Sequence, residues 1–239
     1  MRICCYGSSS SETPKRYLND AASLGRLLAE RDHVCVNGAG KFGCMGSLNQ
    51  ACDAAGGKII GVIHEMFLVD SAEFFDGMHP SYEKKHELIL ARGKNLSERK
   101  KLLVENSEAI IVMPGGPGTY DELWEMACQR NLGMYECPIV CISSDGFYDN
   151  FKRQLLRAEK DKLMRLPASD IIYFCETAEE AVSYCEKNRN LAVKKELKMK
   201  LRHEVSLLVK VTRNLEVVGA LAGGLLLGFA FATLRQRNR

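Results

Sequence analysis

The sequence has ten cysteines but lacks the spacings by which cysteine and histidine usually bind metals. It contains no CxxC or CxxH pair, and its five histidines form neither HxH nor HExxH. These absences argue against a structural zinc site and against a zinc hydrolase. Several cysteines lie instead in apolar runs, where cysteine behaves as a small buried hydrophobe: Cys4, Cys35, Cys141 and Cys175. We therefore expect a reducing compartment and no bound metal.

The chain also lacks a strong excess of charge and a secretory signal. Its formal net charge is only +3, and residues 191–239 carry ten Lys/Arg against three Glu, so residues 1–190 are mildly acidic. An acidic body argues against nucleic-acid binding by the whole protein, and the basic C-terminal part favours a role at a surface or membrane. The N-terminus, MRICCYGSSS, begins at once as a strand, so we expect no secretory signal.

The length of 239 residues suits one α/β domain with an added element. Short apolar runs alternate with helical patterns, which is typical of a mostly parallel sheet covered by helices on both faces. We predict this α/β domain over residues 1–190, with strands at about 2–6, 33–37, 58–63, 87–91, 109–113, 138–142 and 171–175.

The C-terminal part has a different character. Residues 191–216 predict a basic amphipathic helical stalk, residues 217–234 contain no charge, and residues 235–239 form a basic tail. Eighteen residues of helix span about 27 Å, near the ~30 Å of a bilayer's hydrocarbon core. We predict a single transmembrane helix at 217–234; the alternative is a buried helix packed on the domain. The protein would then be a cytosol-facing, C-terminally anchored membrane protein of the mitochondrial outer membrane or endoplasmic reticulum.

Three loops rich in small residues follow predicted strands, at 6–10, 37–46 and 114–122. In open α/β sheets ligands bind beyond the carboxyl ends of the strands, so these loops are expected to converge. The third, PGGPGTYDE, runs into a helix, whose free N–H groups attract anions such as phosphate. It therefore predicts a phosphate site.

The second loop contains the spacing G-x-G-x-x-G at Gly38, Gly40 and Gly43. A dinucleotide fingerprint of this form normally follows the first strand of its unit, whereas this loop follows the second, so we do not favour that interpretation. A simple tight turn would explain Gly38 but not the other glycines.

Arg99, Lys100 and Glu122 are candidate polar site residues, and each has a structural alternative. Arg99 and Lys100 point about 100° apart on a helix, so at most one is centred on a ligand, and arginine's planar fork favours Arg99. Both could instead be solvated surface charges. Glu122 also fits a T-x-x-E capping box with Thr119, which would make it a purely structural residue.

Together these motifs resemble the Lonely Guy family of cytokinin-activating phosphoribohydrolases, long described as lysine decarboxylases. The signature PGGxGTxxE matches residues 114–122, and the family's Arg-Lys pair matches Arg99 and Lys100. YGSSS and GAGKFGCMG are similar to the family's first two loops. The resemblance covers about residues 1–188, with departures at Ala39 and at 95–97, where Asn-Leu-Ser replaces Asp-Met-His.

The resemblance implies a Rossmann-like, doubly wound homodimer that hydrolyses the N-glycosidic bond of a nucleoside 5′-monophosphate, giving free base and ribose 5-phosphate, without metal or other cofactor. It implies that Arg99 and Glu122 are catalytic. The residues expected to bind substrate or phosphate are Lys100, Gly115, Gly116, Gly118, Thr119, Ser8, Ser9, Gly38, Gly40 and Gly43. The alternatives are a nucleotide-binding module without hydrolysis and a membrane-tethered scaffold.

Overall fold

The computed structural model describes residues 1–67 and 86–189. Its strands are β1 (Arg2–Tyr6), β2 (Val34–Asn37), β3 (Lys58–His64), β4 (Glu87–Ala91), β5 (Ala109–Val112), β6 (Ile139–Ile142) and β7 (Tyr173–Cys175). Its helices are α1 (Lys15–Glu30), α2 (Gly43–Ala54), α5 (Ser97–Val104), α6 (Pro117–Asn131), α7 (Asp149–Lys160) and α8 (Ala168–Ile171), with short 3-10 turns η1 (Glu65–Phe67) and η2 (Ser144–Gly146). Residues 178–189 are also helical.

The strands form one parallel sheet in the order β4-β3-β2-β1-β5-β6-β7. From β1 the chain adds strands outward to β4 on one side, then returns to place β5 beside the other edge of β1. The strand order therefore reverses between β1 and β5. In an open α/β sheet this reversal leaves a crevice at the carboxyl ends of the two strands, where ligands bind.

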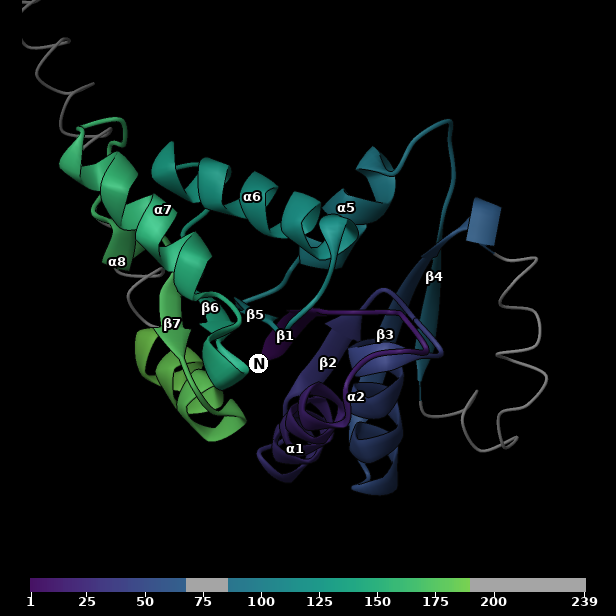
Figure 1. The fold of residues 1–239 in the computed structure, drawn as a ribbon. Coiled ribbons are helices and arrows are strands. Elements are labelled where there is room, and N and C mark those ends of the chain that lie inside the picture. Colours follow the sequence, from purple (N-terminus) through teal and green to yellow (C-terminus); the bar gives the residue numbers. More distant parts are fainter. Residues whose placement is uncertain (68–85, 190–239) are drawn as a thin grey trace, which may run out of the picture. The chain divides into compact units, whose positions relative to one another are not determined.

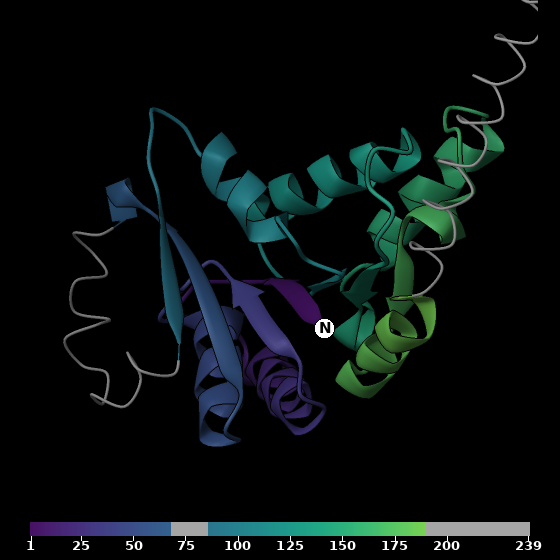
Figure 2. The same ribbon diagram turned by 180° about the vertical axis from the view of Figure 1, so that it is seen from behind.

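Helices cover both faces of the sheet, as the two opposite views show (Figures 1 and 2). One apolar cluster joins the sheet to α1, α2 and residues 178–189, and a second joins it to α5, α6, α7 and α8. Alternate residues of β1 enter different clusters: Ile3 and Cys5 face α1 and α2, whereas Cys4 and Tyr6 face α5 and α6. This is the period-two pattern of a strand buried on both faces.

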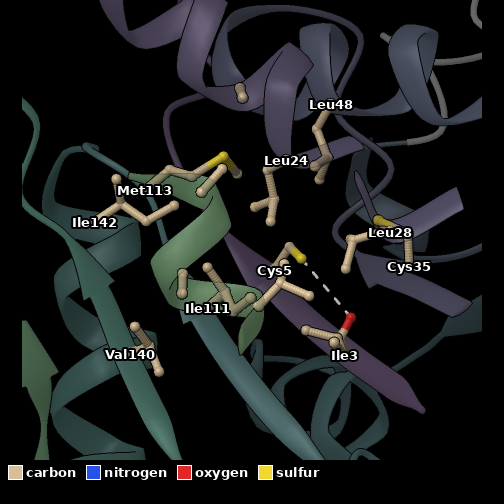
Figure 3. Close-up of a cluster of buried hydrophobic side chains, with 14 of the residues drawn as sticks. Ile3, Cys5, Leu24, Leu28, Cys35, Leu48, Ile111, Met113, Val140 and Ile142 are labelled. Atoms are coloured by element: carbon tan, nitrogen blue, oxygen red, sulfur yellow. Dashed lines mark hydrogen bonds between the residues drawn. The ribbon is translucent and has the colours of Figure 1, made fainter. Parts of the chain in front are cut away.

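Figure 3 shows the first of these clusters from within. Leu24 and Leu28 of α1 and Leu48 of α2 approach side chains of the central strands, among them Ile3, Cys5 and Ile111. All of these side chains are fully buried. Burying such aliphatic side chains stabilises the fold by about 1.5–3 kcal/mol each. The packed core therefore holds the central strands, and with them the loops at their carboxyl ends, in fixed positions.

The sequence-based fold prediction is confirmed for the sheet and corrected for the C-terminal part. All seven predicted strands are present and parallel. The ten cysteines, all of them within the described residues, form no disulfide, and the four expected to be buried are buried. The boundaries of the predicted regions at 190, 216 and 234 stay predictions.

The structure corrects the prediction of a transmembrane helix. In residues 1–67 and 86–189, no helix is long and apolar enough to cross a membrane. The longest helix in this part of the chain, α1, has 16 residues, which is only about 24 Å, and one side of it is polar and exposed. Over the described residues the fold class is therefore a Rossmann-like parallel α/β fold without a transmembrane helix, which corrects the predicted fold class and the membrane-anchored localisation that depended on it. The segments 191–216, 217–234 and 235–239 lie outside the described residues.

Candidate active site

The three loops predicted to converge do meet, at the carboxyl ends of β1 and β5. The backbone N–H of Ser8 donates to the carbonyl of Pro114 over 3.0 Å, and that of Met45 donates to the carbonyl of Ser8 over 3.2 Å. The Ser8 hydroxyl lies 2.8 Å from that of Thr13 and accepts a bond from the N–H of Ser10, so it stabilises its own loop. Ser9, the other predicted serine, is exposed beside it.

The glycine-rich loop after β5 places the start of α6 beside these strand ends. Pro117 is the first residue of the helix and Gly116 its N-cap, and the first helical backbone bond runs from Tyr120 N–H to Gly116 O. The N–H groups of Gly118 and Thr119 therefore precede the helical bonding pattern. A Cβ built on Gly116 or Gly118 would meet nothing within 4 Å. This helix start is thus open to an approaching anion.

Arg99 and Glu122 form an ion pair beside this helix start. Nη1 of Arg99, on α5, lies 3.0 Å from Oε1 of Glu122, on α6, and each side chain is only 13% exposed. Nε of Arg99 donates to the carbonyl of Val62 in β3 over 3.2 Å. The guanidinium is therefore held from two sides, and the alternative that Arg99 is a solvated surface charge is excluded.

Glu122 does not form the capping box that its spacing with Thr119 suggested. Because α6 begins at Pro117, Thr119 is its third residue and not its N-cap, and the N-cap makes no side-chain hydrogen bond. Thr119 is buried against Gly115, where an added Cβ would lie 2.2 Å from the threonine hydroxyl. The Glu122 carboxylate is turned instead to Arg99. Burial raises its pKa above the usual value, and the neighbouring Arg99 opposes this shift.

Lys100 points away from Arg99, as the 100° turn between neighbours in a helix requires. Its Nζ lies 3.1 Å from an Asp121 carboxylate oxygen and 2.7 Å from one of Glu125. The predicted phosphate contact of Lys100 stays a prediction. The sequence analysis missed Glu125 and the Val62 carbonyl. The i, i+4 spacing of Asp121 and Glu125 could have indicated the former, whereas nothing in a sequence marks one backbone carbonyl among many.

The glycines of the second loop are closely packed against residues of the same site. A Cβ on Gly38 would lie 2.1 Å from Nη2 of Arg99, one on Gly40 would lie 2.7 Å from the Met45 side chain, and Gly43 has a positive φ beside the Ser8 carbonyl. The loop therefore gives room for Arg99 and fixes the turn into α2. No group of three or more His, Cys, Asp or Glu side chains in the described part of the chain could hold a metal ion.

Replacing Gly38 by alanine is expected to impair the site more than the fold. The atom that the new methyl group would strike is the end of a flexible side chain, so the protein should accommodate it by moving Arg99. A displacement of about 1 Å can cost ~10²-fold in rate. Activity assays paired with thermal unfolding should show a large loss of activity with little change in Tm. Unchanged activity would mean that the position of Arg99 is not critical.

Comparison with known proteins now adds to this geometry. The family model described as possible lysine decarboxylase matches residues 45–185. A curated relative from rice (Oryza sativa subsp. japonica), the cytokinin riboside 5′-monophosphate phosphoribohydrolase LOG, is 31% identical over 189 residues, covering 76% of this chain and 71% of the relative. The chain belongs to the Lonely Guy (LOG) family. A second LOG relative, LOG3 of Arabidopsis thaliana, is 28% identical over 187 residues, covering 77% of this chain and 81% of its own.

Solved structures show the same fold in proteins with other names. The molybdenum cofactor carrier protein of Chlamydomonas reinhardtii superposes with a TM-score of 0.55 at 18% identity, covering 81% of this LOG-family chain and 98% of the carrier. The molybdenum cofactor binding protein of Rippkaea orientalis gives a TM-score of 0.52 at 17% identity, covering 78% and 94%. At such identities the likeness concerns the fold alone, so the function must be argued from the site.

Proposed function

We propose that this protein hydrolyses the N-glycosidic bond of a purine riboside 5′-monophosphate, of the cytokinin type, and releases the free base and ribose 5-phosphate. The observation that carries the proposal is the Arg99–Glu122 pair, 3.0 Å apart and largely buried beside the open start of α6. The names of the LOG relatives support the same reaction.

The chemistry of the bond fits these groups. Cleavage of a ribosyl C–N bond develops positive charge on the sugar, as in other glycoside hydrolyses. A carboxylate fixed beside the ribose stabilises that charge and orients the ribose hydroxyls or the attacking water. The 5′-phosphate would occupy the start of α6, where the N–H groups of Gly118 and Thr119 are available. Arg99 holds Glu122 in place and favours its ionised form, against the effect of burial, which raises the pKa of this carboxyl group.

The alternative of a nucleotide-binding module without hydrolysis uses the same helix start but has no need for Glu122. A buried carboxylate carries a desolvation cost, which is large unless a partner compensates it. A protein that only bound a nucleotide would place this acid near an anionic ligand with no benefit. The buried pair therefore favours the hydrolase, and a likeness of fold to cofactor carriers does not weigh against it.

The test is an assay of the full-length protein. Incubation with AMP and, separately, with isopentenyladenosine 5′-monophosphate should release free base and ribose 5-phosphate in equal amounts, as followed by chromatography. Arg99→Ala should abolish the release while its thermal unfolding stays cooperative. Binding of either nucleotide without any release of base would instead establish the binding module.

The acid side of the pH–rate profile should report Glu122. Because burial raises the pKa of this carboxyl group above its usual value of 4.5, the active carboxylate is lost at a higher pH than for an exposed glutamate. We expect kcat/KM to fall as pH falls through this raised pKa. The substrate phosphate also titrates, near pH 6. In the Glu122→Gln variant, the pH–rate profile of the residual activity should keep the fall caused by the substrate phosphate and lose the fall caused by Glu122. If the variant and the wild type gave identical profiles, the whole acid limb would belong to the substrate.

A further inference from the structure

Lys100 has no direct part in the reaction proposed above, yet its amino group has two carboxylate partners. Both belong to α6: Asp121 at 3.1 Å and Glu125 at 2.7 Å. They are four residues apart and hence on one face of that helix. The Lys100 side chain is only 20% exposed, whereas those of Asp121 and Glu125 are 58% and 39% exposed, so the amino group is shielded from solvent while its two partners lie at the surface.

The contacts of Lys100 are adjacent in sequence to the catalytic pair on both helices. Arg99 precedes Lys100 on α5, and Glu122 follows Asp121 on α6. Two neighbouring residues of α5 therefore bind neighbouring turns of α6. Figure 1 shows α5 next to one end of α6, and both helices pack on the same face of the sheet. A shift of α5 along α6 would break the contacts of Lys100 and separate Arg99 from Glu122 together.

We propose that Lys100 is a positioning residue: it ties α5 to α6 through Asp121 and Glu125 and thereby holds Arg99 against Glu122. This inference rests on the proposed function, because it assigns those two residues to catalysis. It gives Lys100 no contact with the substrate. It therefore differs in a measurable respect from the sequence-based prediction that Lys100 binds the 5′-phosphate.

A second consequence is electrostatic. Three carboxylates, Asp121, Glu122 and Glu125, stand within five successive residues of α6. Asp121 raises the pKa of Glu122, whereas Lys100 lowers it, after the larger effects of burial and of Arg99. Loss of the lysine would leave two uncompensated carboxylates beside Glu122. Its protonation would then begin at a higher pH.

The other groups facing Glu122 come from β1. Cys4 and Tyr6 lie on the same face of the sheet, and their own pKa values are raised, chiefly by burial and in part by the Glu122 charge. Both are neutral over the range in which Glu122 titrates. They therefore leave its pH dependence to Arg99, Lys100 and Asp121.

The test uses variants of the full-length protein: Lys100→Met, which keeps the apolar stem without the charge, Lys100→Arg, and the matched control Lys101→Met at an exposed neighbour on α5. We expect Lys100→Met to lower kcat roughly 10- to 100-fold, the scale of a misplaced catalytic group. Inhibition of the reaction by inorganic phosphate should be unchanged. Lys100→Arg should restore most of kcat, and Lys101→Met should resemble the wild type.

A double variant distinguishes the mechanical role of the Lys100 contacts from the effect of the Lys100 charge on Glu122. Asp121→Asn with Glu125→Gln breaks the contacts of Lys100 but removes negative charge beside Glu122. We expect a lowered kcat here too, without the shift of the acid limb to higher pH that Lys100→Met should show. If Lys100→Met weakens inhibition by inorganic phosphate and leaves kcat intact, Lys100 binds the phosphate and the inference is overturned.

One readout does not depend on catalysis. With glutamate labelled by ¹³C, the carboxyl signal of Glu122 is identified by its absence in Glu122→Gln, and its titration is compared between the wild type and Lys100→Met. We expect the midpoint to move to higher pH in the variant. An unmoved midpoint would contradict the inference even if the wild type hydrolysed no nucleotide, an outcome that would refute the proposed function separately.

Discussion

Glu122→Gln is expected to lower turnover at least ~10²-fold, the scale on which a positioned charge acts in a shielded site. The amide keeps the size of the side chain and a hydrogen-bond acceptor for Arg99, but it carries no negative charge. Because the side chain is 13% exposed, no bulk water replaces the missing stabilisation of a positively charged sugar. Folding should be nearly normal, since Glu122 caps no helix.

The measurement is kcat with AMP, together with Tm and the affinity for ribose 5-phosphate. The matched control is Glu105→Gln, which neutralises an exposed carboxylate just after α5 and should behave as the wild type. A turnover of Glu122→Gln within a few-fold of the wild type would leave Glu122 as a structural partner of Arg99. A collapse of Tm would show that the ion pair serves the fold first.

The strands could be predicted from the sequence because this sheet is parallel and covered on both faces. Such strands appear as short continuous apolar runs, for example AIIV at β5 and IVCI at β6, and both are fully buried. The uncharged run at 217–234 was interpreted by the same apolarity, but hydropathy alone does not distinguish a membrane helix from other apolar segments.

The candidate site was predictable to the extent that it lies in loops with unusual composition. The glycine runs could be placed at the carboxyl edge of the sheet, and their convergence follows from the parallel topology. The ion-pair partners of Arg99 and Lys100 could not be derived from the sequence in this way. Whether Glu122 caps α6 depends on whether the helix begins at Pro117 or three residues later, and sequence patterns locate helix ends only to within a few residues.

A second large effect is expected from the substrate rather than from the protein: adenosine should react about 10²- to 10⁴-fold more slowly than AMP in kcat/KM. The start of α6 offers the N–H groups of Gly118 and Thr119, and space is open around Gly116 and Gly118. Two hydrogen bonds to a charged group contribute about 1.5–3 kcal/mol each. Since 1.36 kcal/mol corresponds to a factor of ten, their loss gives this range.

The comparison requires full-length protein at a pH where the phosphate is ionised, with free base measured from both substrates. Inorganic phosphate should inhibit the reaction with AMP by competition, because it would occupy the same helix start. It should not inhibit the slow reaction with adenosine in the same way, since a bound phosphate leaves the ribose position free. Equal rates on the two substrates would show that α6 does not bind the phosphate, and its open glycines would then need another explanation.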